Sequence, residues 1–514
     1  MNRPDVTRID ELAQAWAKIA PEHTALVDAG GAWNYRQLEA AIAEAAAWLR
    51  QLGVRPGDRV MLVAENCRAY IALLFATARL DAWPVLVNAR LSLAEIETIR
   101  SHSEARRIIV TAGVSPRAAA HARQLGAESL ALGALGSLAV TPVNDAAQPE
   151  PVERDAAERV AAVLYTSGTT GRPRGVMLTH RGLLFAARAA AEIRAINSED
   201  RLLGVLPLTH SSGLSLVLLS AMAGGAAVHV SHRFDPVSIL SELEQQRLTV
   251  FIGAPAMFAQ LLDYAKFRSL QSVRVPFLRL LSSCSSPLFD PIKEGMERLF
   301  GLVLHNGYGI TECSPGIAAT RLNESRKDTS VGRPYPGIEL RIVDSDGKAV
   351  PSGAPGELWL RGPNVMKGYY RAPEDTAAVL NADGWFKTGD LVRMEGGHLQ
   401  ILGRTKELII HFGFNVYPAE IEALLETHPG VERAAVIGRR VADAEGGETI
   451  IAFVRIAAGA SVSMSELHSF LEGSLAAYKR PAEIIPISEW PLTPTGKIKK
   501  EELARLLDAK AAAL

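Results

Sequence analysis

Residues 165–175 read YTSGTTGRPRG, and this stretch decides how the surrounding chain is interpreted. Its glycines let backbone N–H groups approach an anion, its hydroxyls add hydrogen-bond donors, and its arginines add positive charge. The Gly-Lys-Ser/Thr ending of a Walker loop is missing, and residues 176–178 have the composition of a strand. We therefore predict a strand–loop–strand that holds a nucleotide triphosphate, in preference to a surface loop without a ligand. The residues expected to contact the phosphates are Thr166, Ser167, Gly168, Thr169, Thr170, Gly171 and Arg174.

Short apolar runs alternate with amphipathic helical patterns on both sides of this loop. That alternation predicts an α/β fold. The alanine- and glycine-rich residues 130–150 are expected to form a surface connection. Strands are expected at 59–63, 84–88, 161–165, 202–206, 226–230, 249–252, 278–282, 338–343, 356–361 and 398–402, and helices at 70–80, 93–102, 236–246, 255–265 and 418–427.

The pattern changes near residue 332, where short strands become separated by glycine and proline. A chain of 514 residues also exceeds the size of a single hydrophobic core. We predict an N-terminal domain over residues 1–403, with a β-rich subdomain at about 332–403, followed by a smaller α+β domain over 404–514.

Composition excludes several classes of function. Lys+Arg 55 against Asp+Glu 56 gives a formal net charge of -1, so no broad cationic field is available for nucleic acid or an anionic membrane. No stretch approaches about 18 uninterrupted apolar residues, and the N-terminus lacks a signal-peptide pattern. A cytoplasmic protein without integral membrane association is expected. The three cysteines are widely spaced, which supports neither disulfides nor a zinc site.

The loop and four later segments, in the same order along the chain, resemble the motifs of the adenylate-forming superfamily. That superfamily includes acyl-CoA synthetases, the adenylation domains of peptide synthetases and firefly luciferase, and the chain is most similar to a bacterial acyl-CoA synthetase. The resemblance implies ATP, magnesium and CoA as ligands, layered α/β subdomains, and a mobile C-terminal domain. The later segments are 306–312 (NGYGITE), 384–390 (GWFKTGD), 403–407 (GRTKE) with 413–422 (GFNVYPAEIE), and 491–497 (PLTPTGK).

The chain departs from the family pattern at two places. Arg174 stands where the family usually has lysine, which keeps the charge but changes its reach and its hydrogen-bond fork. Cys284 and Ser285 stand where relatives have two glycines, which narrows the wall of the acyl tunnel or alters the adenine shelf. Ordinary long-chain specificity is therefore not transferred to this chain.

The segment 306–312 corresponds to the family's second nucleotide motif. By resemblance, Asn306 and Gly307 lie against the nucleotide, Tyr308 stacks on adenine, Thr311 binds the α-phosphate, and Glu312 holds magnesium. The alternative from the residues alone is a glycine turn followed by a threonine that caps a helix.

The resemblance assigns four further residues to the ribose and to the second reaction step. Asp390 would accept hydrogen bonds from both ribose hydroxyls with Arg404 nearby, although Thr-Gly-Asp alone is more often an ordinary turn. Lys406 falls at the hinge, and alone would be a solvated surface lysine. Gly413 would lie against the pantetheine arm of CoA, where a side chain would block the tunnel.

Lys497 matches the family's adenylation lysine. A carboxylate and a phosphate repel each other, and an ammonium that touches both offsets this repulsion in the transition state. Its neighbours Lys499 and Lys500 are expected to be solvated, so the Gly-Lys junction singles out Lys497.

The substrate pocket is less well defined by sequence. His210, in PLTHSSG, corresponds to a family histidine that gates or lines the carboxylate site, and a hydrogen-bonded core histidine is an equal alternative. Phe251, Met257, Ile310 and residues 224–225 are candidates for apolar lining, with plain core as the alternative for each.

Together these residues predict an AMP-forming acid:CoA ligase. It would activate a fatty or aryl acid with ATP to an acyl-adenylate, and then transfer the acyl group to CoA. Two alternatives stay open: an adenylation enzyme that loads a carrier protein, and a non-catalytic nucleotide or acyl-adenylate sensor. Sequence leaves the identity of the acid and the oligomeric state undecided, a homodimer among the options.

Overall fold

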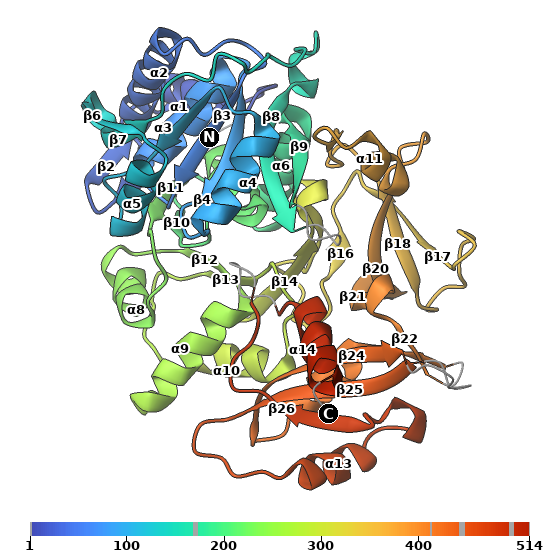
Figure 1. The fold of residues 1–514 in the computed structure, drawn as a ribbon. Helices are drawn as coiled ribbons and strands as arrows, with labels where there is room; N and C mark the ends of the chain where they lie inside the picture. The colour runs from blue at the N-terminus through green and yellow to red at the C-terminus, as the bar shows by residue number, and fades with distance from the viewer. Residues whose placement is uncertain (1–2, 168–172, 412–413, 441–447, 493–497, 513–514) are drawn as a thin grey trace. The chain divides into compact units, whose positions relative to one another are not determined.

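The computed structural model describes residues 3–167, 173–411, 414–440, 448–492 and 498–512. The chain packs into two compact units (Figure 1). The larger unit holds residues 1–339 and 360–386, and the smaller unit holds residues 340–359 and 387–514. The expected domain boundary after residue 403 follows the motifs rather than this packing, and it stays a prediction.

An eight-stranded sheet forms the first layer of the larger unit, in the order β19-β9-β8-β4-β3-β5-β7-β6. Every residue of β3 and β4 is buried, as is usual for parallel strands covered on both faces. Helix α3 packs against both strands. The strands are β3 (Arg59–Ala64), β4 (Trp83–Asn88), β5 (Arg107–Val110), β6 (Glu128–Leu132), β7 (Gly136–Val140), β8 (Val160–Ser167), β9 (Pro173–Thr179) and β19 (Gly368–Tyr369).

The expected surface connection at residues 130–150 is wrong for its first part. Strands β6 and β7 form an antiparallel pair there, and β7 also pairs with β5. Leu138 and Ala139 are fully buried, so this hairpin contributes to the core. Alanine and glycine concealed the strand because both are depleted in strands and neither produces a clear apolar alternation.

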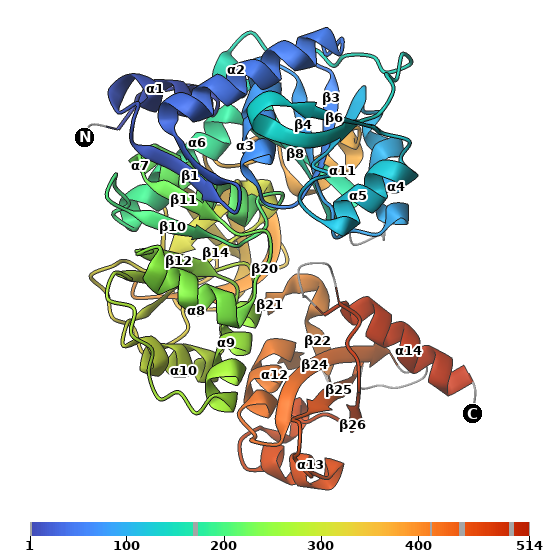
Figure 2. The same ribbon diagram turned by 90° about the vertical axis from the view of Figure 1, so that its left-hand side faces the viewer.

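A nine-stranded sheet forms the second layer, in the order β16-β15-β14-β13-β12-β10-β11-β1-β2. Its central strands β10 to β14 are parallel, and helices α8 and α9 lie next to β12 (Figure 2). The strands are β1 (Thr24–Asp28), β2 (Gly31–Asn34), β10 (Arg201–Gly204), β11 (Ala227–Val230), β12 (Val250–Gly253), β13 (Leu280–Ser283), β14 (Leu304–Gly309), β15 (Gly316–Ala319) and β16 (Arg333–Pro334).

Helices of the larger unit begin at side chains suited to cap them. Thr179 accepts a hydrogen bond from the Gly182 N–H and starts α6, and Ser92 forms a capping box with Glu95 at α4. A π-helix over Ser212–Leu219, which the sequence did not indicate, precedes α7. The helices are α1 (Glu11–Ile19), α2 (Tyr35–Gln51), α3 (Arg68–Arg79), α4 (Leu93–Ser103), α5 (Pro116–Gln124), α6 (His180–Ile193), α7 (Ser220–Gly224), α8 (Pro236–Gln245), α9 (Pro255–Phe267), α10 (Asp290–Phe300) and α11 (Pro373–Val379).

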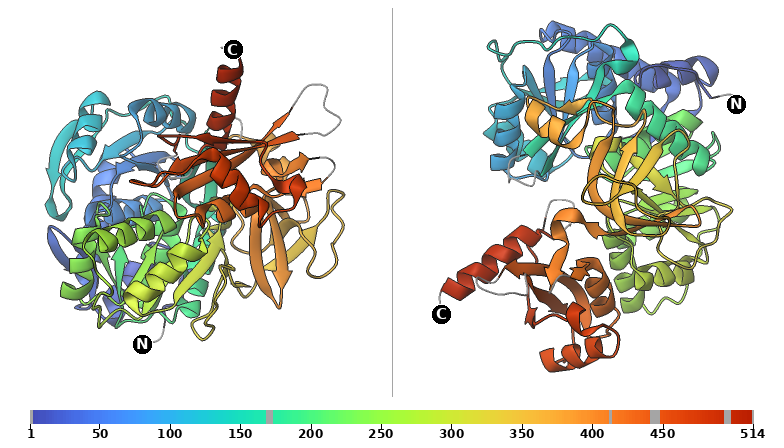
Figure 3. Two further views of the ribbon diagram at one scale, coloured as in Figure 1. Left: turned by 90° about the horizontal axis from the view of Figure 1, so that it is seen from below. Right: turned by 90° about the vertical axis from the view of Figure 1, so that its right-hand side faces the viewer.

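The smaller unit is built on short sheets. They have the orders β17-β18-β20-β21, β22-β23 and β24-β25-β26, and α14 carries the chain towards its C-terminus (Figure 3). The elements are β17 (Glu339–Val343), β18 (Gly356–Arg361), β20 (Phe386–Glu395), β21 (His398–Arg404), β22 (Ile409–His411), β23 (Phe414–Val416), β24 (Val431–Arg440), β25 (Glu448–Ile456), β26 (Glu483–Pro486), α12 (Pro418–Glu426), α13 (Met464–Glu472) and α14 (Lys500–Ala512).

These sheets and helices confirm the predicted α/β class, with a large N-terminal part and a small C-terminal part. All three cysteines are buried. Across the described ranges, no helix combines the length and apolarity needed to cross a bilayer.

Candidate active site

The glycine-rich loop joins two antiparallel strands, as predicted. Strands β8 and β9 stay in register up to the loop, with Thr166 opposite Arg174 and Ser167 opposite Pro173. The two strands that lead into the loop and out of it therefore belong to the eight-stranded sheet. Four residues expected to contact phosphates, Gly168, Thr169, Thr170 and Gly171, lie outside the described residues.

Arg174 is held by two side chains of the larger unit. Its Nε lies 3.1 Å from Asp375 Oδ2, and its guanidinium carbon lies 5.2 Å from the centroid of the Tyr369 ring. The Tyr369 hydroxyl in turn donates a 2.9 Å hydrogen bond to Glu312 Oε1. Burial, together with the negative charge of Glu312, raises the pKa of Tyr369, so the phenol keeps the proton that it donates. Arg174, Tyr369 and Glu312 thus form one connected chain of contacts.

The second nucleotide motif occupies the end of β14 and the short helix η4 (Thr311–Cys313). A Cβ added to Gly309 would lie 1.6 Å from the Pro315 carbonyl oxygen, so only glycine fits there. Ile310, and not Thr311, precedes η4 as its N-cap residue, which removes the capping alternative for Thr311. The Thr311 hydroxyl instead lies 3.2 Å from the Ser211 hydroxyl.

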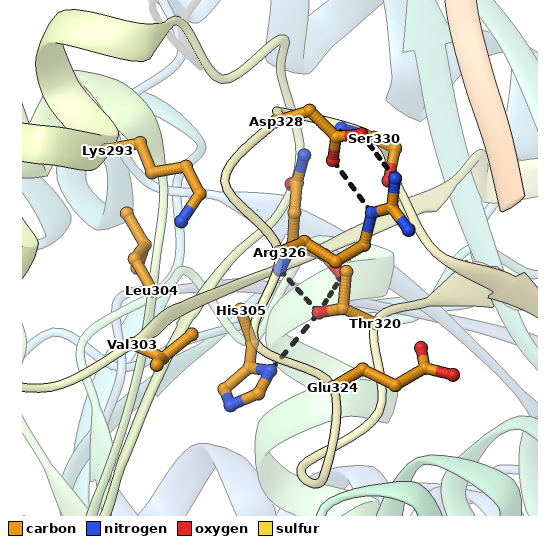
Figure 4. A pocket seen from close by; sticks show the side chains of 10 residues that line it. Lys293, Val303, Leu304, His305, Thr320, Glu324, Arg326, Asp328 and Ser330 are labelled. Atoms are coloured by element: carbon orange, nitrogen blue, oxygen red, sulfur yellow. Dashed lines mark hydrogen bonds and ion pairs between the residues drawn. The ribbon is translucent and has the colours of Figure 1, made fainter.

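Asn306 is locked by its own neighbourhood. Its side-chain amide donates to the Thr329 carbonyl at 2.9 Å and accepts from the Gly307 N–H at 2.9 Å. Asn306 also helps to line a pocket in which several side chains bind one another (Figure 4). Thus His305 Nδ1 lies 3.2 Å from the Thr320 hydroxyl, and Arg326 Nε donates to Asp328 at 2.8 Å. The contact between His305 and Thr320 links β14 to the residue that follows β15.

A different pocket lies on the motif side of β14. It is bounded by the π-helix, by the turn after β13, and by β14 and β15. The polar residues and glycines that line it include Arg194, Ser212, Cys284, Ser285, Gly307, Tyr308, Gly309, Gly316 and Tyr335.

Ser285 has a φ of 77°, in the left-handed region that favours glycine. Its hydroxyl donates to the Ser212 hydroxyl at 2.9 Å, which offsets part of the backbone cost. This conformation gives a physical reason for glycine at the position in relatives, and it places Cys284 and Ser285 in the wall of the pocket.

His210 is half-buried just before the π-helix. Its N–H donates to the Pro207 carbonyl at 3.0 Å, and its own carbonyl accepts from the Leu214 N–H at 2.9 Å. These backbone contacts fix the chain at the start of the π-helix, and the role of the imidazole stays a prediction. Phe251 and Met257 instead pack in a hydrophobic cluster, which favours the plain-core alternative for those two.

In the smaller unit, Asp390 and Arg404 lie opposite each other on β20 and β21. Arg404 Nε donates to Asp390 Oδ1 at 3.0 Å, so the structure brings together the expected pair. Asp390 is 5% exposed, and its N–H donates to the Thr388 hydroxyl at 3.0 Å. The carboxylate is therefore oriented by its strand neighbours.

Lys406 lies in the turn η5 (Thr405–Glu407), and its Nζ is 3.4 Å from Glu501 at the start of α14. Lys500, which was expected to be solvated, is not: its Nζ lies 2.6 Å from Glu422 and 3.0 Å from Glu407. Burial lowers the pKa of Lys500, but Glu422 and Glu407 outweigh it and raise the pKa overall. Gly413 and Lys497 lie outside the described residues.

Three contacts of the site were missed by sequence reasoning. Tyr369 reaches Glu312 across the fold, Ser211 meets Thr311, and Arg194 enters the pocket from the end of α6. Ser211 could have been found from the sequence, because it directly follows His210 in the motif PLTHSSG. Tyr369 and Arg194 carry no local signal, since each meets its partner only through tertiary packing.

Comparison with known proteins assigns the chain to a family. The model of the AMP-binding enzymes matches residues 13–370, and the model of the AMP-binding enzyme C-terminal domain matches residues 420–497. A feruloyl-CoA synthase from Amycolatopsis is 37% identical over 495 residues, covering 95% of this chain and 97% of the relative. An indoleacetate–CoA ligase from Aromatoleum aromaticum is 33% identical and covers 98% of each chain.

Solved structures agree with these relatives. The crystal structure of ATP-bound MatB from Rhodopseudomonas palustris has a TM-score of 0.85 at 30% identity, covering 97% of this chain and 99% of that chain. The reaction class is that of an ATP-dependent, AMP-forming acid:CoA ligase. An enzyme is therefore favoured over the alternative of a non-catalytic sensor. The chain belongs to the family of AMP-binding enzymes.

Proposed function

We propose that this acid:CoA ligase activates aryl or arylalkenoic acids, and that the pocket beside β14 forms part of the site that receives the ring of the acid. The relatives named for ferulate and indoleacetate favour an aromatic substrate. The observation that carries the proposal is the wall of the pocket, which combines Gly307, Gly309 and Gly316 with the aromatic residues Tyr308 and Tyr335. Planar surfaces of this kind suit an aromatic ring.

In the first step, the carboxylate of the acid attacks the α-phosphate of ATP, and pyrophosphate leaves. The Thr311 and Ser211 hydroxyls, 3.2 Å apart, supply donors for oxygens that gain charge in this step. Lys497 would bring its ammonium to the reacting carboxylate and phosphate, and the loop residues Gly168 to Gly171 would hold the leaving phosphates.

Glu312 fits the role of a magnesium ligand. The described residues contain no cluster of three or more His, Cys, Asp or Glu side chains, so an all-protein cage is not offered by them. Magnesium in nucleotide sites is held by one or two carboxylates and by phosphate oxygens. The Glu312 carboxylate, oriented through Oε1 by Tyr369, would hold the ion, which neutralises phosphate charge when bound.

In the second step, the thiolate of CoA attacks the carbonyl of the acyl-adenylate, and AMP leaves. Asp390, buried and fixed by Arg404, would bind the ribose hydroxyls through both steps. The C-terminal domain would turn about Lys406, so that Lys497 withdraws and Gly413 lines the path of the pantetheine arm.

The test separates the two half-reactions. Lys497→Ala should abolish pyrophosphate release from ATP and acid, because the ammonium is lost, while thioester formation from supplied acyl-AMP stays largely intact. Lys499→Ala is the matched control and should leave both half-reactions unchanged. An equal loss of both half-reactions in Lys497→Ala would contradict the assignment of Lys497 to adenylate formation alone.

The acceptor of the acyl group is tested in the same assay. CoA and a phosphopantetheinylated carrier protein are offered to the enzyme after it has formed the adenylate. Faster transfer to CoA supports the acid:CoA ligase, and faster transfer to the carrier supports the carrier-loading alternative.

A further inference from the structure

Arg194 places a buried cation in the wall of the substrate pocket. It is the C-cap residue directly after α6, and it is 3% exposed. It lines the pocket together with Cys284, Gly307 and Tyr335. A Cβ added to Gly307 would lie 3.7 Å from Arg194 Nη2, so the guanidinium reaches the β14 side of the pocket.

The charge of Arg194 is not matched by a nearby protein carboxylate. Its Nη1 donates to the Tyr335 hydroxyl over 3.4 Å. Across the part of the chain that the structure describes, no Asp or Glu oxygen lies within 4.0 Å of this guanidinium. By contrast, Arg279, which donates to the Arg194 carbonyl, has its own partner in Asp200 at 2.5 Å. Burying a charge without a counter-charge has a large free-energy penalty, and an anionic ligand in the pocket would reduce it.

The surroundings strengthen this requirement. Arg321, also next to Tyr335, donates to the carbonyls of Ala319 and Pro334 at 3.0 and 2.7 Å, and the carboxylate of Glu324 acts on it electrostatically. Burial raises the pKa of Cys284, so this thiol stays protonated and supplies no negative charge. Arg321 thus has an acidic neighbour, whereas the partner that the structure gives the Arg194 guanidinium is the neutral Tyr335 hydroxyl, so a ligand is left to balance the charge of Arg194.

We propose that Arg194 binds an ionised oxygen on the end of the substrate away from the reacting carboxylate, so that the enzyme prefers aryl diacids. This inference rests on the proposed function, because it takes the pocket to be the acid site. Gly307, beside Arg194, precedes Thr311 by four residues, and β14 is extended up to Gly309. At a strand rise of about 3.3 Å per residue, the position of Arg194 beside Gly307 is on the order of 10 Å from Thr311 along the chain direction of β14.

A second carboxylate suits this position better than a neutral hydroxyl. A guanidinium can bind a carboxylate through two parallel hydrogen bonds, and such charge-assisted bonds are about twice as strong as neutral ones. An acid without any distal oxygen would enter the pocket and leave the cation unpaired. Sites of this kind reject a substrate that lacks the matching group.

The experiment compares three acids with one carbon frame: cinnamate, 4-hydroxycinnamate and 4-carboxycinnamate. Each is assayed for CoA thioester formation with the wild type, Arg194→Met and Arg194→Lys. Arg188→Met is the matched control, because Arg188 is also on α6 but donates to the Val6 carbonyl and has a side chain 38% exposed. Thermal unfolding of every variant reports whether it folds.

The wild type should give the highest kcat/KM with 4-carboxycinnamate. In Arg194→Met, the ratio of kcat/KM for 4-carboxycinnamate to that for cinnamate should fall about 100-fold, because the cation is lost. Arg194→Lys should retain part of the preference, and Arg188→Met should retain all of it. Thermal stabilisation of the wild type by each acid with ATP gives a second measure that needs no variant.

Three results would overturn the inference. They are a wild type that ranks cinnamate first, a wild type that ranks 4-hydroxycinnamate above 4-carboxycinnamate, and an equal loss on all three acids in a folded Arg194→Met variant. Failure of the proposed function looks different, because then none of the aryl acids yields a CoA thioester in the wild type.

Discussion

Arg174 shows how a single departure from a family pattern can be matched by its neighbours. A lysine at this position would offer a point charge, whereas the guanidinium both pairs with Asp375 and lies over the Tyr369 ring. Tyr369 passes this support on to Glu312 through its hydroxyl. The arginine therefore acts in this chain as a positioning residue, in addition to any contact with phosphate.

The first prediction concerns Tyr369→Phe. The ring and its contact with Arg174 would remain, but the hydrogen bond that orients Glu312 would be lost. Partners behind a metal ligand typically change metal affinity by about 10-fold or more, so the magnesium concentration for half-maximal pyrophosphate release should rise about 10-fold. A magnesium titration measures this. Tyr370→Phe is the control, since the Tyr370 hydroxyl bonds to Glu150 instead, and an equal shift in that variant would contradict the assignment.

Individual contacts were predictable only where both partners lie in recognisable motifs. Asp390 and Arg404 belong to two family motifs, so the resemblance already placed Arg404 near Asp390, and the structure shows them opposite each other on a hairpin. Tyr369 and Glu312 come from distant segments, and a tyrosine carries no mark of the carboxylate that it will meet. Lys500 was misjudged because lysine is usually exposed, and only the packing shows two glutamates around it.

The elements that the sequence predicted correspond to short apolar runs or amphipathic patterns, and many others, such as α1, α2 and α6, were not predicted. The predicted helix at 93–102 is α4 (Leu93–Ser103), and the predicted helix at 418–427 is α12 (Pro418–Glu426). The π-helix at Ser212–Leu219 could not be predicted, because a run of apolar residues does not reveal which hydrogen-bond spacing the tertiary contacts will impose. That element carries Ser212 to the pocket wall, so an irregular turn of helix shapes the site.

The N-terminus of α14 is fixed to the turn η5 by two ion pairs, Lys500–Glu407 and Lys406–Glu501. The second prediction is that Lys500→Met lowers the free energy of unfolding of the smaller unit by about 3 kcal/mol, because Glu407 and Glu422 then lose their shared cation. Hydrogen exchange of α12 and α14 measures this locally.

Lys499→Met is the control for this element. The Lys499 side chain is 40% exposed and pairs with Glu502 at 3.0 Å, so its loss should cost less than about 1 kcal/mol. Equal effects of the two substitutions would show that Lys500 contributes no more than a surface lysine.

At the scale of the whole molecule, a buried histidine makes stability depend on pH. His180 is 1% exposed, and its Nδ1 accepts the Ile9 N–H at 3.1 Å. Burial, with Arg8 and Arg159 adding to it, lowers the pKa of His180 from 6.5 to about 3. As the pH falls, the unfolded chain therefore takes up this proton at a higher pH than the folded protein. The stabilisation that the neutral His180 ring contributes is fully present above pH 6.5 and is lost as the pH falls towards 3.

The third prediction follows from this titration. His180→Asn keeps an acceptor for the Ile9 N–H but removes the ionisable ring, so stability should fall less steeply than in the wild type between pH 6 and pH 4. One proton corresponds to about 1.4 kcal/mol per pH unit. Urea unfolding at a series of pH values gives both slopes. Parallel slopes would contradict the assignment, whatever the offset caused by lost packing.

The pairing of β19 with β9 has a consequence for how the protein is made. Met177 lies opposite Gly368, so the strand β19, which flanks the β8–β9 hairpin, leaves the ribosome roughly 190 residues after the hairpin itself. At usual rates of translation that interval is about 10 to 40 s. A nascent chain therefore exposes the edge of β9 until Gly368 and Tyr369 are synthesised. Only then can the Glu312 carboxylate accept the hydrogen bond of the Tyr369 hydroxyl. The site around Glu312 is therefore completed after Tyr369 is synthesised, although the motif of Glu312 itself is made earlier.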